Sequence, residues 1–480
     1  MSSKARNILL ILLTLVLCYF PLCNRIDLYC IQAWDESRNI TNAIEMLSNH
    51  QWITRHFEGK PDMWDLKPPF LVWLQAASFS IFGFTETAAR LPSMIFSMCT
   101  VLLLIWMGYK LTGKVYAGLL ASLILVSCQG YYGEHMARFG DHEAMLGFFI
   151  TAMIFFAWLY SETSKKIYLI LTIVSLFLGW FTKNIIAFMF LPGICLWFLT
   201  QRKIKDILLN KTFWIGCIII FSLIAAYYFF RERSSPGYMQ EVWMNELFGR
   251  YFDKSTNYHY HKNDFWYYGQ GFVDGRFLPY IYLFVVGLVF AIFRRSLQHR
   301  KFLIYVGIVL VSYFLILSAG TKNFWYDGPL YPTAALFVGL FLYSLFAYFP
   351  LRVFRWIYGI LIILTIYPAY ASAIRFTMEY DKNASHPLQS LCYYLKNKEN
   401  KIPENLKLVP DGFYTPLYFY MAQAKDKGKK IELRKPNELI VGDTFLMNET
   451  TYNSLSDSAF LMQSIHNSGG CVIGKVIEIK

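Results

Sequence analysis

A series of long apolar segments constrains this chain more than any other feature. A transmembrane helix needs about 20 predominantly apolar residues, and the chain contains about eleven segments of this kind. Hydrophobic residues make up 56% of the 480 residues and charged residues only 16%, whereas an ordinary soluble protein carries about 25% charged residues. We therefore expect an all-α polytopic membrane domain, with spans near 8–23, 91–109, 115–130, 142–160, 167–181, 185–200, 212–230, 275–293, 302–318, 332–349 and 356–374.

The distribution of Lys and Arg predicts the orientation of these spans. If the N-terminus is cytoplasmic and the spans alternate, the short inner segments carry 16 Lys and Arg in 43 residues, while the outer loops carry 13 in 134 residues. Cytoplasmic loops are enriched in these residues, so the pattern favours this orientation. It also accounts for much of the net charge of +13 without nucleic acid as a partner. The outer loops are 24–90, 131–141, 231–274 and 319–330.

The first outer loop, 24–90, is not uniformly polar. Apolar residues recur at helical spacing from Asn39 to Leu47, and Pro68-Pro69 precedes a second apolar stretch, 70–84. Both patterns are typical of helices that lie on a membrane surface. A groove between such helices and the membrane domain would admit a lipid headgroup and leave its tail in the bilayer.

The segment 375–480 is polar and contains two strand-like stretches. We expect a membrane domain over 1–374 and a small extracytoplasmic α/β domain over 375–480. Cys392 and Cys471 fall in this second domain, where they could form a disulfide if the domain is exported. The strand-like stretches are Lys429–Leu433 and Cys471–Ile479.

Ionisable residues gather in the loops that we predict on the outer side. Such residues near the apolar zone of a membrane protein are costly and often functional. A carboxylate can take a proton from an acceptor hydroxyl, and cations can hold a departing phosphate. Asp35 could be this base. The cations available for the phosphate are Lys67, Arg138, Lys322 and His261, and further candidates are Glu36, Asp141, His142, Glu143, His259 and Tyr326.

Each candidate also has a structural interpretation. Asp35 could cap a helix, and Lys67 could extend its amine toward the interface. Arg138 and Asp141 could form a structural ion pair at a helix end, and Lys322 could anchor a span at the interface. The joint position of these residues in the outer loops favours a site more than any one of them does.

The first outer loop resembles that of a known family. Its motifs are, in order, W-D-E-S-R at 34–38, K-P-P at 67–69 and A-R-L-P at 89–92. In order and spacing they are similar to the bacterial aminoarabinose transferases of lipid A and the wider protein-mannosyltransferase-like group, which have the GT-C fold. The resemblance extends over roughly residues 1–375, with further matches at Arg138, Lys183, His261, Lys322 and Tyr326.

The resemblance implies roles for individual residues. Asp35 matches the family's catalytic carboxylate, and Lys67 matches the lysine that meets the lipid phosphate. The family usually has Asp about five residues after the arginine that corresponds to Arg138; Glu143 stands there in this chain, and Asp141 precedes it. We favour Asp141 as the second catalytic carboxylate. The implied donor-phosphate site consists of Lys67, Arg138, Lys322 and His261, with Glu36, Arg38, Glu143 and Tyr326 as further site candidates.

The resemblance also implies an activity. It predicts an inverting glycosyltransferase that moves a sugar from a polyprenyl-phosphate donor to an envelope acceptor such as lipid A or another glycolipid. The reaction would take place on the extracytoplasmic face of a bacterial inner membrane. Two departures from the family pattern bear on the identity of donor and acceptor: Asn184 follows Lys183 where the family has Gly, and Asp264 replaces a Pro before the aromatic cluster.

Other functions remain open at this level. The same fold could modify protein hydroxyls as an O-mannosyltransferase, or the chain could be a transporter or flippase of a lipid-linked sugar, or a scaffold. A transporter would place ionisable residues at mid-membrane, whereas here they gather in outer loops. The sequence contains no P-loop or Rossmann fingerprint and makes no cofactor certain. A divalent metal could take part, with ligands from His56, Glu58, Asp62 and Asp65.

Overall fold

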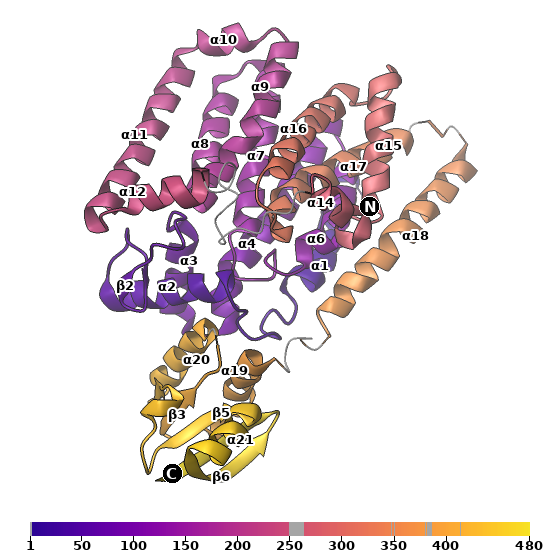
Figure 1. Ribbon diagram of the computed structural model, residues 1–480. Helices are drawn as coiled ribbons and strands as arrows, with labels where there is room; N and C mark the ends of the chain where they lie inside the picture. The colour runs from indigo at the N-terminus through magenta and orange to yellow at the C-terminus, as the bar shows by residue number, and fades with distance from the viewer. Residues whose placement is uncertain are drawn as a thin grey trace. The chain divides into compact units, whose positions relative to one another are not determined.

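The computed structural model describes residues 2–248, 264–346, 348–349, 351–379, 381, 386–412 and 414–480, and its elements are labelled in Figure 1. The chain divides into two compact units, each described here by itself. The first unit consists of Met1–Asn24, Pro61–Leu71 and Pro92–Thr377, and the second of Arg25–Lys60, Val72–Leu91 and Met378–Lys480. The boundary predicted at 374/375 stays a prediction, because the second unit also includes two segments of the first outer loop.

The first unit is built from long apolar helices, as the sequence predicts for a polytopic membrane domain (Figure 1). In the described part of the chain, eight helical segments are long and apolar enough to cross a membrane. A ninth results if Tyr267–Arg276 and Tyr280–Phe293 (α15), which are separated by a bend of 118°, form one broken span. The eight are Ser3–Cys23 (α1), Glu86–Thr112 (α4), Glu143–Thr163 (α7), Lys166–Thr200, Lys211–Ser234 (α11), Arg300–Ala319 (α16), Phe324–Phe346 and Arg352–Phe376 (α18).

This count is lower than the eleven spans that the sequence suggests, for two reasons. The segment predicted at 115–130 forms only Tyr116–Val126 (α5), and eleven helical residues reach about 16 Å, well short of the roughly 30 Å hydrocarbon core. The two segments predicted at 167–181 and 185–200 fall within a single apolar run of 35 residues. That run comprises Lys166–Lys183 (α8), a 3-10 stretch Asn184–Phe190 (η1) and Leu191–Thr200 (α9).

Two helices form the centre of the first unit. In the most apolar 18-residue stretch of α7, 89% of the residues are buried, and in that of Phe324–Phe346 the share is 83%. The second segment comprises η4 (Phe324–Leu330) and α17 (Tyr331–Phe346). A helix that is apolar on all sides and buried on all sides belongs to the interior of a bundle. In α11 no part of the corresponding window is buried, so this helix lies at the periphery.

Two of the loops that the alternation of spans places on the inner side, 161–166 and 294–301, lie together at one end of the first unit. Lys301 forms an ion pair of 2.6 Å with Glu162, which links the loops 161–166 and 294–301. The Trp197 indole donates to Ser161 Oγ over 3.0 Å. Shorter elements of this unit are Gln129–Tyr132 (α6), Ile204–Leu208 (α10), Tyr238–Glu241 (α12), Val242–Phe248 (η2), Tyr267–Gly271 (α14) and Phe272–Arg276 (η3).

The second unit contains a five-stranded mixed sheet in the order β4-β3-β5-β7-β6. The first three of these strands are parallel, and β7 pairs antiparallel with both β5 and β6. The strands predicted at Lys429–Leu433 and Cys471–Ile479 are confirmed as β4 (Lys430–Leu433) and β7 (Cys471–Ile479). The other elements are β3 (Asn405–Val409), β5 (Thr444–Asn448), β6 (Phe460–Ser468), α19 (Pro387–Asn397), η5 (Glu399–Lys401), α20 (Thr415–Asp426), η6 (Pro436–Glu438) and α21 (Glu449–Ser458).

The predicted helix at 39–47 is part of Asp35–Asn49 (α2). Its apolar side chains Ile40, Ala43 and Met46 are buried in the core of the second unit. Protein packing therefore accounts for the apolar face of this helix. Cys392 and Cys471 are also buried in this unit, and both are free thiols. The loop 24–90 further contains β1 (His56–Phe57), β2 (Lys60–Pro61) and α3 (Phe70–Phe82).

Candidate active site

Asp35, the predicted catalytic carboxylate, is the first residue of α2 in the second unit and is half-buried. Trp34 precedes it with a φ of 70° and a side chain that is 62% exposed. A positive φ is rare for a bulky residue, and strained backbone of this kind is concentrated at functional sites. A carboxylate in the first turn is also stabilised by the helix dipole. The local structure thus presents Asp35 at a defined helix end.

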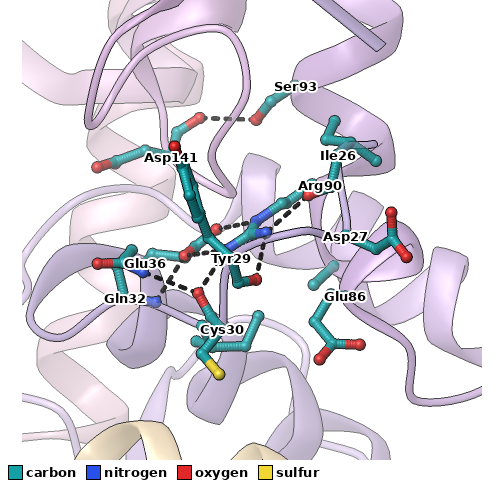
Figure 2. Close-up of polar contacts among 12 residues, drawn as sticks. Ile26, Asp27, Tyr29, Cys30, Gln32, Glu36, Glu86, Arg90, Ser93 and Asp141 are labelled. Carbon is teal, nitrogen blue, oxygen red and sulfur yellow. Dashed lines mark hydrogen bonds and ion pairs between the residues drawn. The ribbon is translucent and has the colours of Figure 1, made fainter. Parts of the chain in front are cut away.

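Glu36, a further site candidate, is committed to a buried ion pair (Figure 2). Arg90 donates from Nε and Nη2 to the two Glu36 oxygens, over 2.7 and 2.9 Å. It also donates to the carbonyls of Ile26, Tyr29 and Cys30 over 2.7 to 2.9 Å. Both ionic side chains are 1% exposed. Arg90 therefore holds the backbone that leads into α2 and thus the position of Asp35, which gives the A-R-L-P motif a physical role.

Arg38, the other basic candidate of this loop, lies with its guanidinium 4.3 Å above the ring of Phe57. This is cation–π geometry, and it fixes Arg38 against the β1 strand of the same unit.

Lys67 belongs to a tight turn in the first unit. Its amine lies 3.1 Å from Asp65 Oδ1, and its side chain is 12% exposed. Asp62 Oδ1 accepts hydrogen bonds from the backbone amides of Trp64 and Asp65, each over 3.0 Å. The Leu66 carbonyl accepts further bonds from Asn184 Nδ2 and the Tyr238 hydroxyl. Hydrogen bonds from several elements thus hold the backbone of the turn that carries Lys67.

Asp141, the second predicted carboxylate, is held between two histidines. Its Oδ2 accepts from His135 Nδ1 over 2.9 Å, and His142 Nδ1 lies 3.3 Å from its Oδ1. Burial alone would raise the pKa of Asp141, but the hydrogen bonds from His135 and His142 hold that pKa well below the usual range. Burial lowers the pKa of His142 to about 4, against the opposing hydrogen bond to Asp141. The carboxylate is therefore ionised at neutral pH.

Lys67 acts on this group of residues through its charge. Besides burial, the positive charge of Lys67 lowers the pKa of His142, whereas Asp65 raises it. The K-P-P turn and the segment before α7 therefore form one polar region within the first unit. Ser93 joins it by donating to the Asp141 carbonyl over 3.0 Å (Figure 2).

Glu143, the alternative second carboxylate, forms an ion pair with Lys183, and both side chains are almost fully buried. The Lys183 amine also lies 5.1 Å from the ring centre of Tyr326, another candidate. Both candidate carboxylates are therefore 1% exposed and paired, Glu143 with Lys183 and Asp141 with the two histidines. Lys183 is one of the positions that resemble the family, but we did not predict it as a site residue. The feature that could have identified it is a lysine at the end of an apolar segment.

Lys322 is 4% exposed and lies at the end of α16. Its amine donates to the carbonyls of Ser318 and Gly320, the latter over 2.8 Å. It lies 5.7 Å from the ring centre of Tyr268. Burial lowers the pKa of Lys322, so an anionic ligand that approached it would favour the charged form.

Arg138 has structural contacts. Its Nη1 and Nη2 atoms donate to the carbonyls of Pro21 and Asn24 over 2.9 and 2.8 Å, where the carbonyls at the end of α1 need partners. These contacts support a structural role at a helix end, although with α1 rather than with Asp141 as the sequence suggested.

A further ionic group was missed by the sequence analysis. Arg276 lies 2.5 Å from Asp327 Oδ1 and donates to its Oδ2 over 2.9 Å, while the Tyr331 hydroxyl donates to the same Oδ2 over 2.6 Å. The guanidinium is 5.3 Å from the Phe324 ring centre. The sequence offered only one signal for this pair: a basic residue, Arg276, and an acidic residue, Asp327, in otherwise apolar segments.

Two other sets of predicted residues stay predictions. His259 and His261 lie outside the described residues. Of the suggested metal ligands, Asp62 accepts backbone hydrogen bonds and Asp65 pairs with Lys67 in the first unit. In the second unit, Glu58 accepts from the hydroxyls of Tyr414 and Tyr418, and His56 Nδ1 bonds to the Thr54 carbonyl. Neither pair by itself makes a metal site.

The long apolar helices and the buried ionic groups are those of a polytopic membrane protein. Comparisons with known proteins show what this chain is similar to. Residues 66–229 match the family model described as dolichyl-phosphate-mannose-protein mannosyltransferase. An uncharacterized protein of Aquifex aeolicus is 25% identical over 71% of this chain and 64% of its own length. An undecaprenyl phosphate-alpha-4-amino-4-deoxy-L-arabinose arabinosyl transferase of Erwinia tasmaniensis is 24% identical over 56% of this chain and 46% of its own length. The matched regions thus cover less than two thirds of these relatives.

The chain shares its fold with a solved structure. The crystal structure of ArnT from Cupriavidus metallidurans bound to undecaprenyl phosphate matches with a TM-score of 0.70 and 14% identity, over 98% of both chains. Its apo structure matches equally well. The chain is thus similar in sequence to aminoarabinose transferases and, over part of its length, to the protein-mannosyltransferase family model, and it shares the fold of ArnT. With its long apolar helices, it is a multi-pass bacterial inner-membrane protein.

Proposed function

We propose that this protein is an inverting glycosyltransferase that moves a sugar from a polyprenyl-phosphate donor to an envelope glycolipid such as lipid A. The observation that carries the proposal is the Lys67 turn: the largely buried Lys67 side chain pairs with Asp65, and its charge acts on His142, the hydrogen-bond partner of the ionised Asp141. Relatives named as undecaprenyl-phosphate aminoarabinose transferases support the same donor class.

The proposed reaction needs separate roles for anionic and cationic side chains. Asp35 takes the proton from the acceptor hydroxyl or orients that hydroxyl. The hydroxyl oxygen attacks the anomeric carbon on the face opposite the phosphate, so the configuration inverts and the lipid phosphate leaves. Lys67 and Lys322 stabilise the phosphate as its negative charge develops. The assignment of Asp35 rests on the family resemblance of its loop and on its place at the start of α2.

Asp141 and Arg138 have more limited proposed roles. Asp141 is the second carboxylate, which orients His135 and balances the positive charge around the leaving phosphate. Arg138 remains a candidate phosphate ligand through the resemblance, but its contacts with the end of α1 favour a supporting role.

The proposed orientation follows the positive-inside pattern. The N-terminus is cytoplasmic, and the sheet-containing C-terminal segment and the active site are periplasmic. Support comes from the inner-side loops 161–166, 201–211 and 294–301, which meet at one end of the first unit. A lipid-linked donor on the periplasmic face would need no soluble nucleotide site.

A second candidate keeps the chemistry and changes the acceptor. The family model that matches residues 66–229 is described as a protein mannosyltransferase, so protein O-glycosylation is the alternative. Envelope lipids and glycoproteins from a deletion strain would distinguish the two acceptors, because only the true product class would lose its sugar.

The reaction is tested by release of polyprenyl phosphate from a panel of lipid-linked sugars, with envelope extract as the acceptor. We expect release by wild-type protein, loss with Asp35→Asn and retention with Asp27→Asn, whose side chain is exposed in the same loop. Equal release by wild type and Asp35→Asn would remove Asp35 from the mechanism. Vesicle transport of the same lipids without any release would favour the transporter alternative.

A further inference from the structure

An apolar pocket of about 520 Å³ lies between five helices of the first unit, α7 to α11. Its lining is almost entirely aliphatic and aromatic. The Thr172 hydroxyl donates to the Tyr168 carbonyl over 2.7 Å, and Asn210 donates to the Tyr160 hydroxyl over 3.0 Å. The pocket therefore offers little to a polar ligand or to ordered water, which needs several polar partners.

The pocket is bounded by the most peripheral apolar helix. No part of the apolar window of α11 is buried, and Phe221 and Leu208, which line the pocket, are 73% and 47% exposed. The lining thus continues onto the surface that faces lipid in a membrane-spanning bundle. A hydrocarbon chain could enter sideways from the bilayer without crossing a polar barrier.

One end of the pocket meets a strongly basic loop. Ile204, Ile207 and Leu208 of α10 line the pocket, and α10 belongs to the loop 201–211. Among the described residues, the exposed cations of this loop form no ion pair or side-chain hydrogen bond. They are Arg202, Lys205 and Lys211.

Acidic groups do not neutralise this loop. Asp206 is its only acidic residue, and Glu162 of the adjacent loop pairs with Lys301 over 2.6 Å. Lys203, the fourth cation of this loop, differs from the three exposed ones because its amine donates to the Ser161 carbonyl. The indole of Trp214, half-exposed, donates to the Leu208 carbonyl over 2.7 Å, and tryptophan at such a position is typical of the membrane–water interface.

We propose that this pocket binds an acyl chain of an anionic phospholipid whose phosphate contacts Arg202, Lys205 and Lys211. An apolar pocket between helices with a basic cluster at its end is the chemistry that selects anionic lipids. The headgroup belongs to the leaflet at the 201–211 end, which the proposed orientation makes the cytoplasmic one. The site is therefore separate from the Lys67 region, and it stabilises the packing of α11 against α8.

The proposal is tested by the lipids that stay bound to the detergent-purified full chain. Native mass spectrometry should detect phosphatidylglycerol or cardiolipin on the wild type. In Arg202→Gln/Lys205→Gln/Lys211→Gln, we expect the affinity for phosphatidylglycerol added in nanodiscs to fall on the order of a hundredfold. The matched control Arg294→Gln/Arg295→Gln/Arg352→Gln, which removes three exposed cations elsewhere, should keep the affinity.

A second pair of variants tests the apolar half of the site. Cys217→Phe fills the pocket that Cys217 lines and should displace the lipid, whereas Cys99→Phe lies outside the lining and should not. Equal losses in both charge variants would overturn the proposal, and so would phosphatidylcholine binding as tight as phosphatidylglycerol. A polyprenyl lipid as the only bound species would also overturn it. Polyprenyl-phosphate release by the purified enzyme is a separate readout, so failure of the proposed reaction would leave this result interpretable.

Discussion

At the scale of single residues, the charged side chains of the first loop divide by what they contact. Asp35 lies half-buried at the start of α2, whereas the adjacent Glu36 gives both carboxylate oxygens to Arg90. Two neighbouring acids thus differ in chemistry because one is paired in the core and the other is not. Arg138 and Lys67 also differ in their contacts: the Arg138 guanidinium donates to carbonyls at the end of α1, whereas the Lys67 amine pairs with Asp65 and its side chain stays 12% exposed.

Removal of Arg90 should destabilise the protein strongly. Arg90→Met leaves the Glu36 carboxylate buried without its partner, which typically costs about 3–5 kcal/mol. Thermal unfolding of the purified protein measures the effect. Arg90→Met/Glu36→Leu should regain part of the loss, because both charges are then absent. Lys301→Ala, which breaks the exposed pair with Glu162, should cost less than about 1 kcal/mol; a similar loss in both single variants would contradict the argument.

His142 should make stability depend on pH. Its pKa is about 4 in the folded protein, below the ordinary value of about 6.5, so the unfolded chain binds the proton more readily between these values. Stability is therefore full above about pH 6.5 and falls as the pH drops toward 4, by up to about 3 kcal/mol. His142→Gln should flatten this part of the profile in thermal unfolding. An unchanged slope in the variant would show that His142 is not the titrating group.

At the scale of elements, close helix contacts decide which helices stay in the interior. In α5, a Cβ added at Gly118 would lie 2.5 Å from Ile105 Cα in α4, so these helices touch through backbone. The short α5 is thereby held inside the first unit although it is too short to span a bilayer alone. In contrast, Gly359 in α18 has no atom within 4 Å of such a Cβ.

Substitution of these two glycines should have opposite effects. Gly118→Ala forces α4 and α5 apart and should destabilise the protein by about 1–3 kcal/mol. Gly359→Ala should be neutral or stabilising by up to about 1 kcal/mol, because alanine has the higher helix propensity. Thermal unfolding of both variants gives the comparison, and equal destabilisation would argue against the close packing of α5.

At the scale of the whole molecule, much of the architecture was predictable. Each predicted span falls on helical structure, and the strands at Lys430–Leu433 and Cys471–Ile479 were confirmed, because apolar runs and alternating patterns are local. The number of spans was less predictable. The sequence does not show whether a helix break, such as the one at Asn184 with a φ of 54°, separates two spans or lies within one apolar run. The candidate site residues stay a prediction from motifs, and the partners of Arg138, Glu143 and Glu36 could not be predicted from the sequence.

The proposed orientation predicts which surfaces are accessible from outside the cell. Ser458→Cys, in the C-terminal α21, should react with a membrane-impermeant maleimide in intact spheroplasts above the wild-type background. Ser296→Cys, exposed in the loop 294–301, should react only after the membrane is opened. The reverse pattern would invert the orientation.

The sequence by itself determined the membrane class, the position of most spans and the residues at which chemistry is expected. These depend on transfer from water to lipid and on short motifs, which act within a few residues. Only the tertiary structure decided which charges are paired, because the partners are far apart in the chain: Arg90 with Glu36, Lys183 with Glu143, and Arg276 with Asp327. Burial makes each pairing obligatory, and folding alone decides which groups are buried together.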